Sequence, residues 1–336
     1  MADRLFWTAA RSTDPFYNLA MEEYMTLHCP EGTVILFLWQ NKKTVVIGRN
    51  QDAYRECRAE LLAAEGGTLA RRASGGGAVF HDLGNLNFTF IARAADYNVD
   101  RQLDVILCAL DRLGIDARKS GRNDLTADGR KFSGSAFFKS GDFCYHHGTL
   151  MLDVDKDMVD RYLTVSREKL SSKGVASVRS RVVNLAEFVP GLSIEQLAKS
   201  LLEAFSETYA LPASELSKDV LPADALAQLR ERYASWDWRF GRHIPSGWEI
   251  TRHFEWGELT IRLKTDHGVI TDVDVFSDAM DYAFAARLKS ALAGCRCEDA
   301  ALFAAVSSVP EITDNMRSDI SEMLTESGGG GNDTRI

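Results

Sequence analysis

The sequence predicts an α+β chain organised as two domains. Its 336 residues, of which 45% are hydrophobic, suggest a soluble protein with substantial cores. Short runs of β-forming residues alternate with amphipathic stretches, and near the end three strand candidates precede several helical patterns. We therefore expect a larger domain at residues 1–240 and a small α+β accessory domain at 245–326. A disordered tail is expected at 327–336, where four consecutive glycines leave nothing to bury.

Three helices are predicted from their end signals. Asp14 followed by Pro15 marks a helix start, because an N-cap side chain precedes proline at the first helical position. Apolar residues then recur at helical spacing, at Phe16, Ala20, Tyr24 and Leu27. A second apolar stripe ends at Gly114, a C-terminal cap signal. Ser193 and Gln196 form a capping box for a third helix.

The strands predicted are short. Residues 33–39 and 44–47 are apolar runs too short for helices, and we expect them to pair as a hairpin. Apolar and polar residues alternate over 86–90, which is typical of a half-buried strand. Asp128-Gly129 predicts a tight turn at the start of a meander. The remaining strand candidates are 131–138, 143–152, 248–254, 259–264 and 269–276.

Charge and cysteine content narrow the function classes. The net charge of -9 argues against a nucleic-acid binder, although local basic clusters suit a small phosphate compound. No apolar run long enough to span a membrane is present, and the charged start of the chain lacks the apolar stretch of a signal peptide, so we expect a cytoplasmic protein. The six scattered cysteines indicate neither a disulfide framework nor a zinc site.

The most informative segment runs from Arg71 to Asp82, where three glycines lie between a pair of arginines and a strand. Consecutive glycines allow close backbone approach and can direct several N–H groups at one anion, while arginine offers a bidentate fork for phosphate or carboxylate. The spacing matches neither a P-loop nor a dinucleotide-binding fingerprint. The alternative interpretation is a tight turn with exposed arginines.

A second segment places a carboxylate and a lysine in the predicted meander. Lys131 is flanked by small residues, and a compact ammonium there can stabilise negative charge that develops between a carboxylate and an α-phosphate. Asp124 is a candidate Mg²⁺ ligand, because Mg²⁺ takes one or two carboxylates together with phosphate oxygens. The alternatives are a solvated strand lysine and a turn aspartate.

Two further segments carry histidines and basic residues. His146 and His147 follow each other on one strand and must face opposite sides, so they cannot easily share one metal ion. We expect one to pack in the core, while the other is free to line a pocket. The basic segment that starts at Lys173 suits a loop that folds over an anion, with a solvated surface loop as the alternative.

In their order and approximate intervals, these four segments resemble the lipoate-protein ligase A family. The match is most specific at 71–90, which includes R-R-x-S-G-G-G-A-V-F-H, at 121–136, which includes K-x-S-G-S-A, and at 173–185, and it is weakest beyond residue 245. It implies a mixed-sheet catalytic domain of the biotin/lipoate ligase fold, followed by the small accessory domain.

The resemblance also implies site residues. Lys131 is similar to the family's essential lysine and is the catalytic candidate, and Asp124 is the Mg²⁺ candidate. ATP and lipoyl-AMP binding is expected at Arg72, Gly75, Gly76, Gly77, Ala78, Val79, Phe80, Asp124, Lys131 and Lys173. Lipoate binding is expected at Ser74, His81, Lys131 and His147.

The implied reaction has two half-reactions. Lipoate and ATP give lipoyl-AMP and pyrophosphate, and the lipoyl group then passes to a lysine of a lipoyl domain of an oxo-acid dehydrogenase E2 subunit or of the glycine-cleavage H protein. Joining two anions needs cations, for which Arg72, Lys131 and Mg²⁺ are the candidates. Such acceptors are usually acidic, so we expect a basic rim at Arg118, Lys119 and Arg122. The protein is expected to be a monomer.

Three alternatives stay open. A related octanoyl or lipoyl transferase would act through a cysteine thioester, for which Cys144 is the nearest candidate. A biotin ligase would carry a differently arranged glycine and arginine loop. A non-catalytic module that binds an acyl-adenylate or a lipoyl protein would have no evident need for Lys131 together with a carboxylate and a closing loop.

Overall fold

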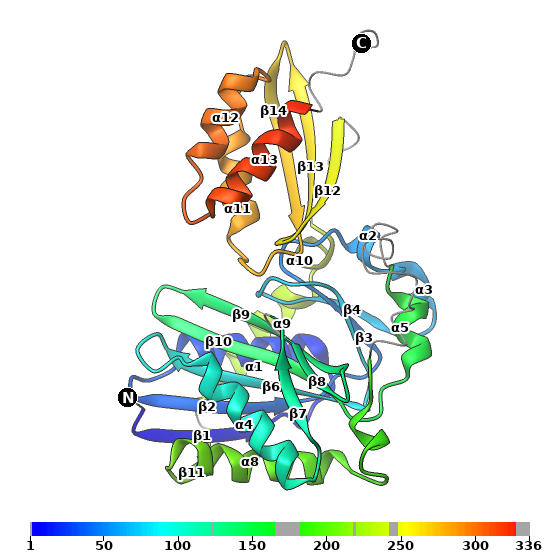
Figure 1. The fold of residues 1–336 in the computed structure, drawn as a ribbon, viewed down its shortest axis with the longest axis vertical. Helices are drawn as coiled ribbons and strands as arrows, with labels where there is room; N and C mark the ends of the chain where they lie inside the picture. Colours follow the sequence, from blue (N-terminus) through cyan, green and yellow to red (C-terminus); the bar gives the residue numbers. More distant parts are fainter. Residues whose placement is uncertain (1, 122–123, 165–181, 218–219, 242–247, 327–336) are drawn as a thin grey trace.

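The computed structural model describes residues 2–121, 124–164, 182–217, 220–241 and 248–326, which form a larger and a smaller body (Figure 1). The larger body is built on an eight-stranded sheet in the order β11-β1-β2-β6-β10-β9-β8-β7. β1 runs parallel to β2 and β11, and the other neighbours are antiparallel, so the sheet is mixed. The strands are β1 (Arg4–Ala9), β2 (Thr33–Trp39), β6 (Asn85–Arg93), β7 (Ala117–Ser120), β8 (Asp124–Ala127), β9 (Arg130–Ser140), β10 (Phe143–Met151) and β11 (Ala213–Glu215).

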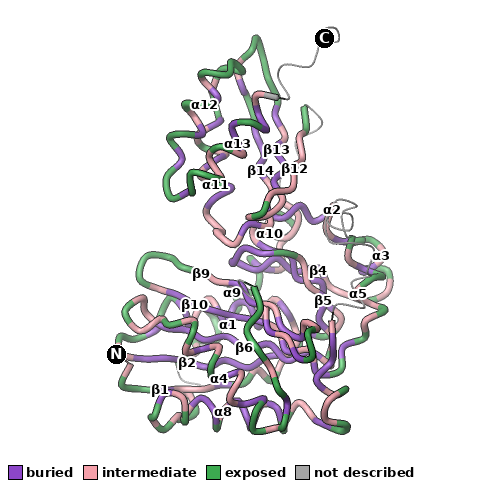
Figure 2. The backbone as a smooth tube through the Cα atoms, in the orientation of Figure 1, coloured by how far each residue is buried: buried purple, intermediate pink, exposed green. Residues whose placement is uncertain are grey.

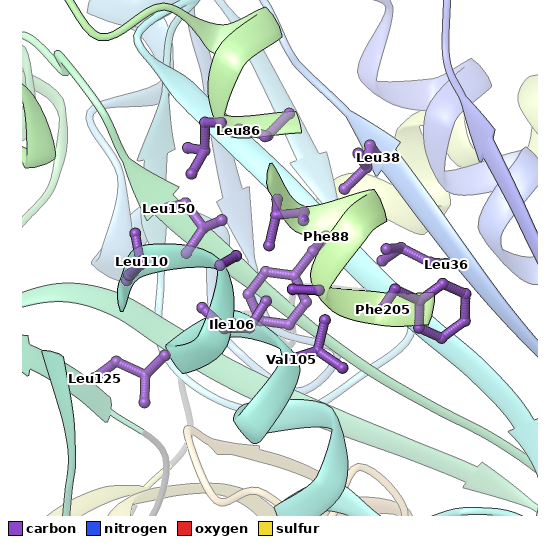
Figure 3. Packing of buried hydrophobic residues seen from close by; sticks show 14 of the residues in the cluster. Leu36, Leu38, Leu86, Phe88, Val105, Ile106, Leu110, Leu125, Leu150 and Phe205 are labelled. Carbon is purple, nitrogen blue, oxygen red and sulfur yellow. The ribbon is translucent and has the colours of Figure 1, made fainter. Parts of the chain in front are cut away.

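Two helices cover one face of this sheet, α4 (Val99–Arg112) and α8 (Ile194–Tyr209). Phe88 and Phe90 of β6 have no exposed surface and belong to the core formed with these helices. Figure 3 shows Phe88 with Leu36 and Leu150 from the neighbouring strands, which extend the same core. The capping box of Ser193 begins α8 as the sequence predicts, and Gly114 follows α4 with a φ of 78°. A short 3₁₀ turn, η1 (Leu185–Glu187), borders this layer.

The opposite face carries helices and a second sheet. α1 (Pro15–Leu27) and α9 (Ala223–Ala234) pack on it, and Asp14 caps α1 as predicted. Beside them lies a three-stranded sheet in the order β4-β3-β5. Its strands and the short helices around it are β3 (Thr44–Ile47), β4 (Thr68–Arg71), β5 (Val79–His81), α2 (Ala53–Glu56), α3 (Ala59–Ala64), α5 (Lys156–Tyr162) and α10 (Trp236–Phe240). The central strands are therefore buried on both faces (Figure 2).

The smaller body is an antiparallel sheet with helices on one side. Its strands are β12 (Trp248–Phe254), β13 (Gly257–Asp266) and β14 (Val269–Ser277), and its helices are α11 (Phe284–Leu292), α12 (Asp299–Ser307) and α13 (Asp314–Glu326). Apolar residues from both layers form a separate core. The predicted small α+β accessory domain and the mixed-sheet larger domain are confirmed.

Two local predictions are wrong. Strands β2 and β3 form no hairpin, because β2 pairs with β1 and β6 whereas β3 pairs with β4 and β5 in the second sheet. Strand β6 is buried along nearly its whole length rather than half-buried, because Thr89 on its polar side contacts Glu22 of α1 and not solvent. Helix α1 is present where predicted, and its buried face also includes the polar residues Asn18 and Glu22, while Leu27 at its end is exposed.

Within the described ranges, no helix is long and apolar enough to cross a bilayer.

Candidate active site

A cavity of about 160 Å³ lies between the large sheet and the three-stranded sheet. Three parts of the chain surround it: the glycine segment after β4, the small-residue stretch of β9, and the polar edges of β2, β6 and β10. Its lining residues are Trp39, Val46, Arg72, Gly76, Gly77, Ala78, Val79, His81, Asn87, Lys131, Gly134, Ser135, Ala136, His147, Gly148 and Thr149. Residues 72–79 and 131–136, which are far apart in the sequence, therefore meet at one place.

The two arginines that open the glycine segment have different roles. Arg71 is buried, and its guanidinium donates to the carbonyls of Gly48, Arg49, Gln51, Trp238 and Arg239, so it ties α10 to the base of the loop. Arg72 lines the cavity. Its Nη2 donates to the carbonyls of Gly75 and Gly77 at 2.7 and 2.8 Å, and its Nη1 donates to Val46 at 3.1 Å. Arg72 therefore shapes the glycine loop and also brings its positive charge to the cavity wall.

Lys131 and Asp124 lie side by side on neighbouring strands. The Lys131 Nζ is 2.7 Å from Asp124 Oδ1, and the two side chains are 41% and 34% exposed. Gly134 leaves the room for the lysine, because a Cβ at that position would lie 3.0 Å from Nζ. The ammonium thus reaches the cavity from β9 while the carboxylate holds it.

The cavity contains a buried hydrogen-bond donor that the protein leaves unused. His81 accepts from Asn41 Nδ2 at its Nδ1, with a separation of 3.2 Å, which assigns the ring proton to Nε2. Among the described residues Nε2 has no partner. Burial, together with the charge of Arg72, lowers the pKa of His81 to about 3, so the ring is neutral. His81 therefore offers one neutral N–H to an acceptor in the cavity.

The two adjacent histidines face opposite layers, as predicted. His146 packs among Phe88, Phe90 and Phe137 on the α4 side, and burial lowers its pKa to about 3. His147 points to the α1 side, where its Nδ1 lies 2.8 Å from Glu22 and its Nε2 lies 2.8 Å from Ser74. Ser74 thus lies behind the cavity wall, within hydrogen-bond distance of His147.

The accessory domain touches the glycine segment. Gly76 N–H donates to the Ala279 carbonyl at 3.3 Å, and a Cβ on Gly75 would lie 2.4 Å from the same carbonyl and 2.7 Å from that of Met280. Asn50 makes further hydrogen bonds across this interface, to Ser277 and Tyr282. In this arrangement the absence of a side chain at Gly75 permits domain contact.

Some predicted site features lie elsewhere. Phe80 is outside the cavity lining, because its ring packs on Tyr162 in a neighbouring core. Lys173 and Arg122 fall outside the described residues. In the proposed basic rim, Arg118 pairs with Asp116, and Lys119 pairs with Asp100 and Asp104, so both positive charges are compensated locally. The described residues contain no cluster of three or more possible metal ligands.

Sequence reasoning missed the cavity residues Trp39, Asn87 and Thr149 and the buried Glu22 beneath them. The alternation in β6 was an available signal, since Asn87 and Thr89 share one side of that strand. Polar residues at regular spacing in a strand were assigned to a solvent face, whereas they face the cavity and α1.

Comparison with models of known families shows to which family the chain belongs. The model of the lipoyl protein ligase A/B catalytic domain matches residues 14–206, which is more than half of the chain. The chain belongs to this family. A second model, the bacterial lipoate protein ligase C-terminus, matches residues 247–324. The first match lies within the larger body, and the second covers most of the accessory domain of this lipoate ligase family member.

Solved structures support the same assignment. A bi-partite lipoate protein ligase from Thermoplasma acidophilum, studied with its E2 lipoyl domain, is 28% identical with a TM-score of 0.63, over 73% of this chain and 99% of that one. A lipoate-protein ligase A bound with ATP is 27% identical with a TM-score of 0.61, over 72% and 99%. P. falciparum LipL1 in complex with lipoate shares the fold over 96% and 99%, with a TM-score of 0.84 at 24% identity.

Proposed function

We propose that this family member activates lipoate with ATP as lipoyl-AMP and then transfers the lipoyl group to a lysine of a lipoyl domain or of the glycine-cleavage H protein. The observation that carries the proposal is the convergence of Lys131, Arg72 and the His81 Nε2–H on one narrow cavity. Two cations and a neutral donor suit a ligand with a carboxylate and a phosphate. Two relatives, one bound with ATP and one studied with its E2 lipoyl domain, agree with this chemistry.

In the first half-reaction, a lipoate carboxylate oxygen attacks the α-phosphorus of ATP, a carboxylate–phosphate anhydride forms, and pyrophosphate leaves. Both reactants are anionic, so Lys131 and Arg72 lower the repulsion between them and stabilise the charge on the transferring phosphate. Lys131 exchanges its Asp124 partner for these oxygens. The narrow cavity holds the lipoate carboxylate and the α-phosphate close together, and this positioning supplies part of the rate enhancement.

Asp124 is the proposed ligand of Mg²⁺. The described residues hold no group of three or more possible metal ligands, so Asp124 suits an ion that takes most of its ligands from phosphate and water. When bound, Mg²⁺ would neutralise phosphate charge as a Lewis acid.

In the second half-reaction, the acceptor lysine attacks the acyl carbon, and AMP leaves. Because AMP is already a good leaving group, positioning of the amine carries more of the reaction than a strong enzymatic base. The cysteine alternative is not supported, because Cys144 is 1% exposed, lies outside the cavity lining and has its thiol pKa raised by burial.

The test is pyrophosphate release by the full chain with ATP and lipoate, with and without an acceptor lipoyl domain. We expect release that requires lipoate, and acceptor modification on a lysine detected by mass spectrometry. Well-folded protein that releases no pyrophosphate in either reaction would refute the proposal. Acceptor modification without ATP consumption would favour a transferase instead.

A further inference from the structure

A carboxylate is buried beneath the cavity. Glu22, on α1, is 2% exposed and lies outside the cavity lining. Within the described part of the chain no lysine or arginine forms an ion pair with it. Its Oε1 instead accepts from Thr89 Oγ1 at 2.7 Å and from His147 Nδ1 at 2.8 Å. A buried carboxylate is costly unless hydrogen bonds compensate it, so these two contacts are essential to its presence.

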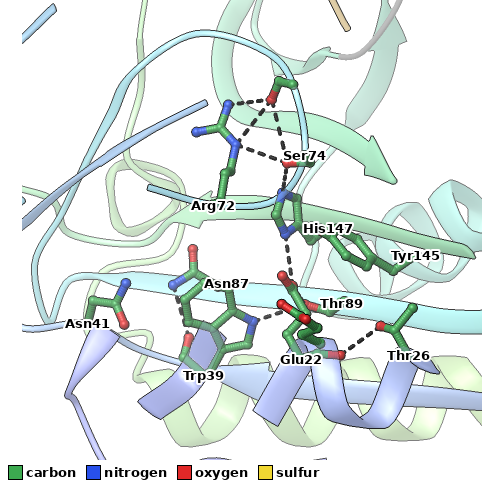
Figure 4. A network of polar contacts seen from close by, with 12 residues as sticks. Glu22, Thr26, Trp39, Asn41, Arg72, Ser74, Asn87, Thr89, Tyr145 and His147 are labelled. Atoms are coloured by element: carbon green, nitrogen blue, oxygen red, sulfur yellow. Dashed lines mark hydrogen bonds and ion pairs between the residues drawn. The ribbon is translucent and has the colours of Figure 1, made fainter. Parts of the chain in front are cut away.

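One hydrogen-bond chain joins Glu22 to the glycine loop (Figure 4). A carboxylate only accepts, so His147 carries a proton on Nδ1, and its Nε2 lies 2.8 Å from Ser74 Oγ. Ser74 Oγ in turn accepts from Arg72 Nε at 3.1 Å. The same guanidinium holds the carbonyls of Gly75 and Gly77. The contacts therefore run without a break from the Arg72 guanidinium through Ser74 and His147 to Glu22.

A second chain joins Glu22 to the opposite wall. Thr89 and His147 are direct partners across β6 and β10, so both side chains reach the same carboxylate oxygen. Thr89 Oγ1 also accepts from Trp39 Nε1 at 3.0 Å. Trp39 and His147 both line the cavity. One buried oxygen therefore fixes side chains on two walls of the cavity.

We propose that Glu22 is a positioning residue for the acyl substrate, because it is the acceptor at which both hydrogen-bond chains end. It touches no reacting atom; it sets the orientation of Trp39 and His147 and, through Ser74 and Arg72, the shape of the glycine loop. The identity of the substrate rests on the proposed function. The role requires an acceptor oxygen at this position rather than a negative charge. The side-chain carbonyl oxygen of a glutamine also offers two lone pairs and should therefore fulfil it.

Three variants separate this role from simple stability. Glu22→Gln keeps an acceptor oxygen, whereas Glu22→Met removes it at similar size. The matched control is Glu23→Met on the same helix, because Glu23 pairs with Arg232 and Tyr233 of α9 and lies outside the cavity lining. For each full-length protein we would measure thermal unfolding, amide hydrogen exchange of residues 74–81, and KM and kcat for lipoate in the pyrophosphate assay.

Loss of two hydrogen bonds to a charged group predicts that Glu22→Met raises the lipoate KM by at least about tenfold and changes kcat by less than about threefold. Hydrogen exchange in 74–81 rises in the same variant. Glu22→Gln and Glu23→Met keep KM and loop exchange near wild type, although Glu23→Met lowers the unfolding temperature. If Glu22→Met does not fold, Thr89→Val severs the Trp39 branch alone and is expected to raise KM.

Unchanged KM and loop exchange in folded Glu22→Met, or in Thr89→Val if that variant replaces it, would overturn the proposal. So would a Glu22→Gln variant as impaired as Glu22→Met, since charge rather than acceptor position would then matter. The exchange measurement needs no ligand, so it decides the positioning role even if wild-type protein releases no pyrophosphate. Wild-type protein that releases no pyrophosphate would refute the proposed function but not the positioning role of Glu22.

Discussion

Replacing Lys131 with methionine removes an ammonium from the cavity wall and leaves Asp124 without its ion-pair partner, 2.7 Å away. Both side chains are partly exposed, so an effective dielectric near 20 applies, and one charge pair about 4 Å apart is then worth about 4 kcal/mol at most. In the free protein Lys131 already interacts with Asp124, so part of this energy is exchanged rather than gained. We predict that kcat for adenylate formation falls by about 10²- to 10³-fold, the range found for removal of one stabilising donor.

The assay is single-turnover formation of lipoyl-AMP from ATP and lipoate, followed by quenching and chromatography. Lys139→Met is the matched control, because Lys139 lies on the same strand but faces a different groove. The double variant Lys131→Met, Asp124→Asn tests whether the defect comes from an orphaned carboxylate. We expect the double variant to remain impaired. A Lys131→Met rate within about threefold of wild type, or full rescue in the double variant, would refute a charge-stabilising role.

Three further predictions concern stability and domain contact. Phe90→Ala removes a fully buried ring packed on Phe205 and should lower the free energy of unfolding by about 3–5 kcal/mol in urea titrations; a loss below about 1 kcal/mol would contradict the packing. His146 has a folded-state pKa of about 3 against an ordinary 6.5, so the unfolded chain binds its proton first and stability should fall as pH drops from 6.5 toward 3. His146→Gln should make that decline shallower, and an unchanged pH dependence of the urea midpoint would show that the ring does not stay neutral. Gly75→Ala should speed hydrogen exchange at residues 277–283 because its Cβ would meet two accessory-domain carbonyls, whereas Gly77→Ala, with open space around it, should not; equal exchange in both would contradict the domain contact.

Local signals predicted local structure well. Asp14 before Pro15 and Ser193 with Gln196 are complete capping arrangements within a few residues, and both begin helices where expected. The turn at Asp128 and Gly129 has the positive φ angles, 50° and 70°, that its composition favours. These features need no distant partner, so the sequence alone specifies them.

Pairing between distant segments was not predictable in the same way. Strands β2 and β3 are close in sequence and equally apolar, yet their partners come from β1, β6, β4 and β5. Burial on both faces removes the alternation that would distinguish a central strand of one sheet from a strand of another. The hairpin prediction failed for this reason.

The site residues also divide into those that the local sequence indicates and those that depend on distant partners. The glycine segment and Lys131 could be singled out because their residue types imply anion chemistry. Glu22 could not, since a glutamate in an amphipathic helix is normally solvated and its partner His147 is 125 positions away. The resemblance assigned Arg72 to ligand binding, whereas much of its hydrogen bonding is to the loop itself.

The central claim is that this cavity forms an acyl-adenylate, and the most direct measurement is detection of that intermediate. Wild-type protein would be incubated with ATP, Mg²⁺ and lipoate without an acceptor, and the bound small molecules identified by mass spectrometry. We expect lipoyl-AMP in stoichiometric amount, with pyrophosphate in equal quantity, and loss of lipoyl-AMP when an apo lipoyl domain is added. An acceptor that becomes lipoylated while no lipoyl-AMP or pyrophosphate appears would contradict it.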